Sequence, residues 1–355
     1  MVMDPAVVRL FEKIAFEHIS DVGIERFRAE YLARTARAPS PIVLPSVVDR
    51  RVPDGPKLRV YRPEVPESAA GSVGGSARGS VGGSASREEL LPLVVFFHGG
   101  GWTVGNLDTH DHIAREIAVQ VGAVVVAVDY RLAPEHPYPA AVDDAWAALR
   151  WAVAQASELG VDPTRVAVAG DSAGGNLAAA VAQLARDAGG PLLKFQLLWY
   201  PATSLDPDLP SMAENSTAPI LSLLDMQLFQ AAYTGDADPA TLPATYLPAR
   251  AADLHDLPPA YIATATFDPL RDDGAAYAEL LRRNGVSVEL QNHDGLTHGF
   301  VGYVQWVPAA AAALARSLMA IRAVLVEPTV TSVLRSPRCC AVLGDAQCSV
   351  TRSAG

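Results

Sequence analysis

Residues 170–174, which read Gly-Asp-Ser-Ala-Gly, carry the clearest chemical signal in the chain. They follow an apolar run from Arg165 that is typical of a strand, and they lead directly into an alanine-rich stretch with helical periodicity. A turn this sharp between a strand and a helix holds its central residue in strained geometry, so the flanking positions need glycine. A serine here projects at the helix N-terminus, where developing negative charge is stabilised. We therefore predict that Ser172 is a catalytic nucleophile.

A serine hydroxyl is a weak nucleophile by itself, so a base must take its proton and an acid must orient that base. Asp268 lies just beyond the apolar run of residues 261–266, at the end of a predicted strand. It could instead cap the helix that begins near Arg271. Asp272 and Asp273 are equally near that helix start and can serve as caps, which leaves Asp268 as the predicted acid.

Two histidines compete for the role of base. His293 comes immediately after the strand predicted from Val286, and we expect it at the surface. His298 lies deeper in the following loop, beside Gly299, whose backbone freedom allows the ring to approach Ser172. We therefore predict that His298 is the base.

The stretch His-Gly-Gly-Gly-Trp, residues 98–102, ends another apolar run of strand length. Acyl transfer places negative charge on a carbonyl oxygen, and backbone N–H groups aimed at that oxygen stabilise it. Glycines allow the backbone to come close enough. We assign these donors to Gly100, Gly101 and Ala173, the residue after the nucleophile, and expect His98 to anchor the loop.

No other residues predict a bound group. His110 and His112 form a His-x-His pair near a helix start, where side chains two positions apart diverge. The three cysteines, Cys339, Cys340 and Cys348, lie close to the C-terminus without a CxxC spacing. We therefore predict neither a metal nor a cofactor.

Continuous apolar runs of strand length alternate with helical segments along most of the chain. Runs without polar alternation indicate strands covered on both faces, as in a parallel sheet between two layers of helices. We predict an α/β fold with a mostly parallel sheet of about eight strands. The stretch 46–63 reads as two alternating strands around an Asp54-Gly55 turn, so the sheet is expected to open with an antiparallel hairpin.

The organisation we predict has one catalytic domain with added segments. The catalytic domain covers residues 46–326, and residues 1–45 form an N-terminal appendage that packs on it. Residues 67–88 contain a Gly/Ser-rich duplication that predicts a mobile loop, and residues 327–355 have no periodic pattern and predict a disordered tail.

Composition limits the partners. Half of the 355 residues are apolar, and the net charge of −11 argues against nucleic acid and anionic membranes. The chain has neither an apolar run of membrane-spanning length nor a signal peptide, so we expect a cytoplasmic protein with a small-molecule ligand. The oligomeric state is open between a monomer and a homodimer.

Five motifs in order resemble the hormone-sensitive lipase-like α/β-hydrolases, the bacterial family IV esterases with a GDSAG elbow. They are HGGGW from His98, DYRLAPEHPYPAA from Asp129, GDSAGGNLA from Gly170, DPLRDDG from Asp268 and HGF from His298. The resemblance covers about residues 5–326. It implies the same triad and oxyanion donors that the residues predict. It also implies a cap, built from the N-terminal segment and residues 203–250, and a bracing role for the second motif.

The resemblance implies a carboxylesterase that hydrolyses short to medium acyl esters through an acyl-enzyme. A lipase, an amidase or deacetylase and an acyltransferase use the same triad and stay open as alternatives. A non-catalytic ligand receptor on this fold would lack the triad histidine, whereas His298 is present. The chain departs from the family pattern at Thr266, where such proteins often carry an acidic residue, and in its Gly/Ser duplication and Cys-bearing tail.

Overall fold

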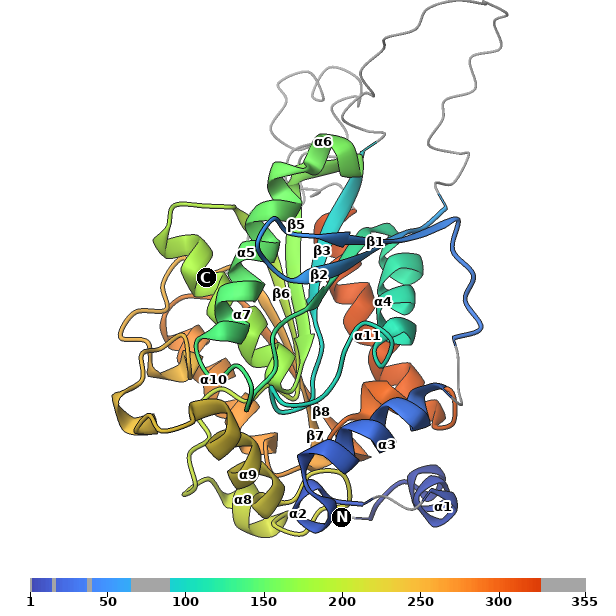
Figure 1. Ribbon diagram of the computed structural model, residues 1–355, viewed down its shortest axis with the longest axis vertical. Helices are drawn as coiled ribbons and strands as arrows, with labels where there is room; N and C mark the ends of the chain where they lie inside the picture. Colours follow the sequence, from blue (N-terminus) through green and yellow to red (C-terminus); the bar gives the residue numbers. More distant parts are fainter. Residues whose placement is uncertain (1, 15–16, 37–39, 65–89, 327–355) are drawn as a thin grey trace, which may run out of the picture.

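The computed structural model describes residues 2–14, 17–36, 40–64 and 90–326, and its centre is an eight-stranded sheet (Figure 1). The order of strands is β1-β2-β4-β3-β5-β6-β7-β8. β2 pairs antiparallel with both β1 and β4, and all other neighbours are parallel, which confirms the predicted hairpin and the mostly parallel sheet. The strands are β1 (Ser46–Arg51), β2 (Lys57–Arg62), β3 (Leu91–Phe97), β4 (Val124–Asp129), β5 (Val161–Asp171), β6 (Leu193–Trp199), β7 (Ala260–Phe267) and β8 (Val288–Thr297).

Helices cover both faces of the sheet (Figure 1). One layer contains α5 (Ala140–Ala154), α7 (Ala173–Asp187) and α10 (Arg271–Arg283), and the other contains α4 (Asp111–Ile117), a π-helical turn (Ala118–Gly122) and α11 (Pro308–Leu325). The central strands are apolar on both sides because each side packs on one layer. In β3, for example, Leu93 and Val95 are buried in the first core and Val94 and Phe96 in the second.

The described residues also contain six further helices and three short turns. They are α1 (Pro5–Lys13), α2 (Ile19–Val22), α3 (Ile24–Ala36), α6 (Ala156–Leu159), α8 (Pro210–Glu214) and α9 (Leu223–Thr234), with short 3₁₀ turns at Pro239–Thr241, Pro248–Arg250 and Phe300–Tyr303. α2 and the adjoining end of α3 lie beside α9 at one end of the sheet, although these segments are far apart in sequence (Figure 1). His18 Nδ1 is 2.5 Å from Asp225 Oδ2, and the rings of Phe27 and Phe229 meet edge to face at 6.3 Å.

α4 begins at Asp111, with His110 as its N-cap. The Thr109 hydroxyl donates to the Asn106 carbonyl oxygen at 2.9 Å and contacts the His110 ring at 2.8 Å. Thr109 is therefore held in a local turn just before the helix. The predicted insert 67–88 and the cysteine-bearing tail 327–355 lie outside the described residues.

α11 is the one helix in the described ranges whose length and apolar composition would suit a membrane span. Its inward face, which includes Leu314, Leu318 and Ile321, is buried in the second core. Trp199 of β6 is fully buried against this helix and donates its indole N–H to Ser317 Oγ at 3.0 Å. The helix thus packs on the sheet as part of the domain core.

Replacement of Ser317 by alanine is expected to lower the free energy of unfolding by about 1–3 kcal/mol, because the buried indole N–H of Trp199 loses its acceptor. Urea unfolding followed by tryptophan fluorescence measures this change. The exposed Ser157→Ala is the control and should stay within about 0.5 kcal/mol of the unchanged protein. Equal urea midpoints for the two variants would show that the bond contributes nothing.

Candidate active site

The structure brings Ser172, His298 and Asp268 into one hydrogen-bonded line. His298 Nε2 lies 2.9 Å from Ser172 Oγ, and His298 Nδ1 lies 2.8 Å from Asp268 Oδ2. All three side chains are buried, and Asp268 has no exposed surface. The serine follows β5, the aspartate follows β7 and the histidine follows β8, so all three come from the carboxyl ends of parallel strands. This geometry suits proton transfer from a hydroxyl to an imidazole that a carboxylate orients.

Ser172 sits in the sharp turn between β5 and α7, with a φ of 55° that side chains seldom adopt. Its N–H donates to the Trp199 carbonyl oxygen at 2.8 Å, which fixes the turn to the neighbouring strand. The flanking glycines are required by space, since a Cβ at Gly170 would lie 2.1 Å from the Gly174 carbonyl oxygen and one at Gly174 would lie 2.0 Å from that of Phe97. Close packing therefore holds the strained serine in place.

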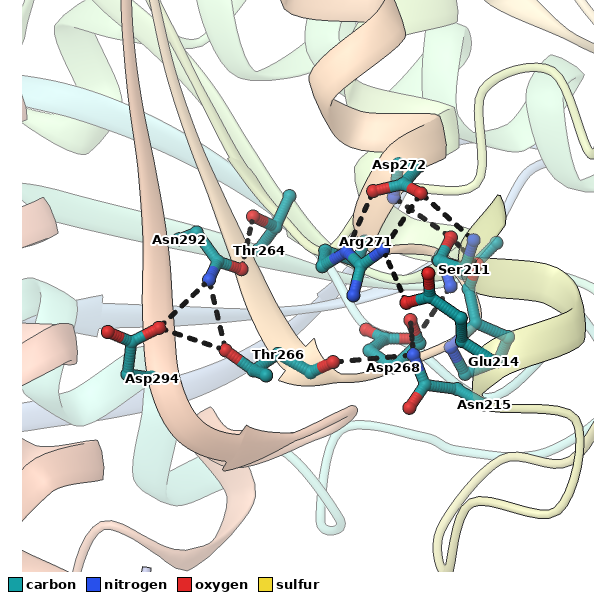
Figure 2. Close-up of polar contacts among 12 residues, drawn as sticks. Ser211, Glu214, Asn215, Thr264, Thr266, Asp268, Arg271, Asp272, Asn292 and Asp294 are labelled. Atoms are coloured by element: carbon teal, nitrogen blue, oxygen red, sulfur yellow. Dashed lines mark hydrogen bonds and ion pairs between the residues drawn. The ribbon is translucent and has the colours of Figure 1, made fainter. Parts of the chain in front are cut away.

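Asp268 is held by backbone groups and by the segment between β6 and β7 (Figure 2). Its Oδ1 accepts from the Leu270 N–H at 2.8 Å, which leaves Oδ2 for His298. The Asn215 side-chain amide donates to the carbonyl oxygens of Asp268 and Thr266 at 3.2 and 3.3 Å. The main chain that carries the carboxylate is thus held by a residue far away in sequence.

Asp272 and Asp273 do not cap α10, contrary to the expectation from sequence, because the N-cap residue Leu270 has no side-chain bond and both aspartates bind the segment after β6. Asp273 is fully buried and accepts from the N–H groups of Thr203, Ser204 and Leu205. Asp272 accepts from the Ser211 N–H at 2.9 Å (Figure 2). The sequence analysis did not identify these aspartates as anchors of the segment after β6. The signal that could have indicated them is the Asp272-Asp273 pair that follows Asp268.

Polar partners on the neighbouring strand surround Thr266, the position at which the family resemblance implies an acidic residue. The Thr266 hydroxyl donates to Asp294 at 3.1 Å and accepts from the Asn292 amide at 3.0 Å (Figure 2). β8 therefore supplies an acidic side chain at this place. His293 is not the surface residue we expected, because β8 extends past it and its half-buried ring meets Phe300 at 5.2 Å. Burial lowers the pKa of His293 to about 4.

The glycine loop after β3 lies beside Ser172. Gly100 and Gly101 have φ values of 119° and 56°, and a Cβ on Gly101 would lie 2.3 Å from the Phe229 ring. The Gly99 N–H donates to Asp171 Oδ1 at 2.8 Å, which ties this loop to the serine turn. Glycine is thus needed here both for backbone angle and for space.

His98 braces the loop from behind. Its ring stacks on Tyr130 at 4.2 Å, and the Tyr130 hydroxyl donates to the His98 carbonyl oxygen at 2.7 Å. Burial, followed by the nearby His110, lowers the pKa of His98 to about 3, so the ring is neutral at neutral pH. Tyr130 belongs to the stretch 129–141, for which the resemblance implies a bracing role.

Two adjoining cavities meet at the serine turn. The first, of about 110 Å³, is bordered by Ser172, the glycine loop and apolar side chains of α3 and α9. The second, of about 180 Å³, is bordered by apolar side chains of α1 and of the segment after β8, and by polar side chains at the start of α4. Tyr31 and Asp171 border both cavities. α3 contributes Phe27 and Tyr31 to the border of the first cavity, a long-range contact of the N-terminal segment.

The described residues contain no group of three or more His, Cys, Asp or Glu side chains arranged to hold a metal ion. The sheet order, the strained serine turn and the hydrogen-bonded side chains at the strand ends are typical of the α/β-hydrolase class.

Comparison with known proteins agrees with this class. The profile of a family described as alpha/beta hydrolase fold matches residues 94–302. Esterase LipI of Mycobacterium tuberculosis H37Rv is 47% identical over 323 residues, which are 91% of this chain and 95% of that protein. Carboxylesterase NlhH of the same strain is 59% identical over 238 residues, 66% of this chain and 74% of that protein. The structure of an esterase from the archaeon Pyrobaculum calidifontis, 34% identical, gives a TM-score of 0.79 and covers 91% of this chain and 99% of its own. The chain belongs to the α/β-hydrolase fold family, as the sequence predicted.

The Asp273→Ala variant is expected to lose about 3 kcal/mol or more of unfolding free energy, because three backbone N–H groups lose their acceptor. Thermal and urea unfolding measure the loss. Asp208→Ala, at an exposed aspartate of the same segment, is the matched control and should be close to neutral. If Asp273→Ala unfolds like the control, Asp273 does not anchor this segment.

Proposed function

We propose that this protein hydrolyses carboxylic esters with short to medium acyl chains, and that Ser172, His298 and Asp268 carry out the reaction. The observation that carries the proposal is the continuous hydrogen-bonded line from the serine hydroxyl to the buried carboxylate. Activity on carboxylic esters follows from relatives named esterase and carboxylesterase at 47% and 59% identity. The protein is an enzyme of the ester hydrolase type.

The geometry supports a two-step acyl transfer. Ser172 Oγ attacks the ester carbonyl carbon while His298 Nε2 takes the hydroxyl proton, and Asp268 holds the imidazole in the required tautomer. When the tetrahedral intermediate collapses, His298 returns the proton to the leaving alcohol and the acyl group stays on Ser172. A water molecule then attacks the acyl-enzyme by the same proton route and releases the acid.

The developing oxyanion is stabilised by backbone N–H groups. We assign the donors to Gly100, Gly101 and Ala173, which border the same cavity as Ser172. The bond from the Gly99 N–H to Asp171 keeps the glycine loop at a constant distance from the serine turn. No metal or cofactor takes part in this proposed mechanism.

We also propose that residues 1–45 and 203–250 form a cap over the catalytic domain, residues 46–326. The edge-to-face contact of Phe27 with Phe229 and the contact of His18 with Asp225 join the two cap segments. Apolar side chains of both segments border the first cavity, so the acyl chain of the substrate is expected to lie there. The volume of that cavity, about 110 Å³, supports a preference for short chains.

The Ser172→Ala variant is expected to lose turnover by about a million-fold, because the attacking group is removed while the binding site remains. Hydrolysis of p-nitrophenyl butyrate measures the loss, and thermal unfolding checks that the variant is folded. Ser157→Ala, at an exposed serine, should keep full activity. Ester hydrolysis by folded Ser172→Ala at near the original rate would end the proposal.

The acyl preference is expected to depend on Phe229, whose ring closes over the glycine loop. Among p-nitrophenyl esters from acetate to palmitate, kcat/KM should be about 100-fold higher for butyrate than for palmitate, because the longer chain does not fit the small cavity. Phe229→Ala should reduce this ratio to about tenfold, since discrimination by an apolar pocket is on the order of 10- to 200-fold. The half-exposed Leu228→Ala on the same helix is the control. An unchanged ratio in Phe229→Ala would place the acyl chain elsewhere.

A further inference from the structure

Arg28 of α3 joins the N-terminal segment to the glycine loop after β3. Its Nε donates to the Thr103 carbonyl oxygen at 2.6 Å, and its Nη2 donates to the Ala133 carbonyl oxygen at 2.7 Å. Both carbonyl groups belong to residues with no exposed surface. Nη1 and Nη2 also donate to the carboxylate oxygens of Glu135, at 2.6 and 2.8 Å. One guanidinium therefore holds two main-chain segments against α3.

The carboxylate of Glu135 fixes the plane of this guanidinium. A guanidinium is flat and its N–H groups point in set directions, so two bonds to a carboxylate leave other N–H groups aimed at the two carbonyl oxygens. The bond from Arg28 lowers the pKa of Glu135 to about 2, so the carboxylate is charged at neutral pH. The Glu135 side chain is 56% exposed, and such an ion pair adds little to stability. Its contribution is therefore the orientation of the guanidinium.

The Thr103 carbonyl group belongs to the turn that carries two of the proposed oxyanion donors. The Thr103 N–H donates to the Gly100 carbonyl oxygen at 3.0 Å and closes the turn around Gly101. The Ala133 N–H donates to the Trp102 carbonyl oxygen at 2.8 Å, so the second segment that the guanidinium holds is itself bonded to this turn. Gly100 and Gly101 have positive φ values, and a glycine backbone has more freedom than that of other residues. The direction of their N–H groups therefore depends on contacts from outside the turn.

α3 also connects this contact to the first cavity. Phe27 directly precedes Arg28, and Tyr31 lies one helical turn after it on the same helix. The side chains of Phe27 and Tyr31 border the first cavity, whereas Arg28 is not among the described residues that border either cavity. Arg28 can therefore influence the reaction through the glycine loop, and not by touching the substrate.

The proposed reaction depends on where the N–H groups of the glycine loop point. Negative charge appears on the carbonyl oxygen only when Ser172 attacks, so donors aimed at that oxygen stabilise the transition state more than the bound ester. We propose that Arg28 is a positioning residue that holds the N–H groups of Gly100 and Gly101 toward this oxygen. This inference rests on the proposed esterase function. It makes the N-terminal segment, through one side chain, a condition for efficient acyl transfer.

The first measurement is the hydrolysis of p-nitrophenyl butyrate by the Arg28→Met variant, whose apolar side chain cannot donate to either carbonyl oxygen. The kcat/KM per active site is expected to fall about 10- to 100-fold, because misdirected donors still act but complete removal of one donor costs about 100-fold or more. Titration with a fluorophosphonate counts the active sites, so a smaller fraction of folded protein does not enter the result. A kcat/KM within about threefold of that of the unchanged protein would overturn the proposal.

Two inhibitors show whether the loss belongs to the oxyanion. The Ser172 hydroxyl oxygen adds to the carbonyl carbon of 1,1,1-trifluoro-2-heptanone, the hydroxyl proton passes to His298, and the π electrons of the carbonyl bond become the charge of an oxyanion. The alcohol 2-heptanol has the same carbon chain without a carbonyl group, so it binds but forms no oxyanion. In Arg28→Met the inhibition constant of the ketone should rise by about the factor by which kcat/KM falls, while that of the alcohol stays within about twofold. An unchanged constant for the ketone, or an equal rise for both inhibitors, would contradict the proposal.

Two further variants are the controls. Arg26→Met removes an exposed arginine of the same helix, which bonds to Glu17 and Glu30, and should leave kcat/KM unchanged. Glu135→Gln keeps the guanidinium and an acceptor for it, so its loss should be about threefold at most. A loss in either control equal to that in Arg28→Met would show that the carbonyl contacts of Arg28 are not responsible.

A conservative variant keeps the test open if Arg28→Met does not fold. Arg28→Lys keeps the charge but lacks the planar fork that reaches both carbonyl oxygens, so kcat/KM should fall about fivefold or more. Full activity of Arg28→Lys would overturn the proposal. If the esterase proposal itself were wrong, the unchanged protein would not cleave p-nitrophenyl butyrate, which differs from cleavage that does not depend on Arg28.

Discussion

The strained turn at Ser172 is the constraint on which the rest of the structure depends. A φ of 55° at a serine persists only if the surroundings leave no alternative. Here Gly170 and Gly174 let α7 approach β3 and β5 to the limit of contact, and a hydrogen bond to Trp199 fixes the turn to β6. Burial of the alanine-rich α7 between the strands and its neighbours thus holds the serine hydroxyl in one place.

The other parts of the site are positioned relative to that turn by single polar contacts. Asp171 holds the glycine loop by accepting from the Gly99 N–H. Burial raises the pKa of Asp171, but the nearby His110 and the Gly99 N–H outweigh burial. The pKa of Asp171 is therefore lowered, and its carboxylate stays charged. On the other side, Asn215 and Asp273 tie the segment after β6 to the loop that carries Asp268. The segments that border the two cavities are therefore linked to the residues that do the proposed chemistry.

Features that depend on nearby sequence could be predicted. The order of strands and helices, the antiparallel hairpin at the start of the sheet and the sharp turn at Ser172 follow from periodicity and from glycine placement, and the structure has all three. Asp268 and His298 could be chosen because each stands beyond a strand end. Their catalytic roles are proposals, but their distances to each other and to Ser172 suit them.

Features that depend on distant contacts could not be predicted. Asp273 looked like a helix cap, since nothing nearby in sequence indicates that residues 203–205 return to it. His293 looked exposed, because the continuation of β8 past it is set by pairing with β7. The second cavity, at Tyr200 and His112, joins α4 to the end of β6, and only the folded chain brings the two together.

The most direct test of the central claim is peptide mapping by mass spectrometry after reaction with a fluorophosphonate, which forms a stable ester with an activated serine. The account predicts one adduct, on Ser172, with loss of ester hydrolysis in the same proportion as labelling. An adduct on another residue, or full hydrolysis by protein fully labelled at Ser172, would contradict it.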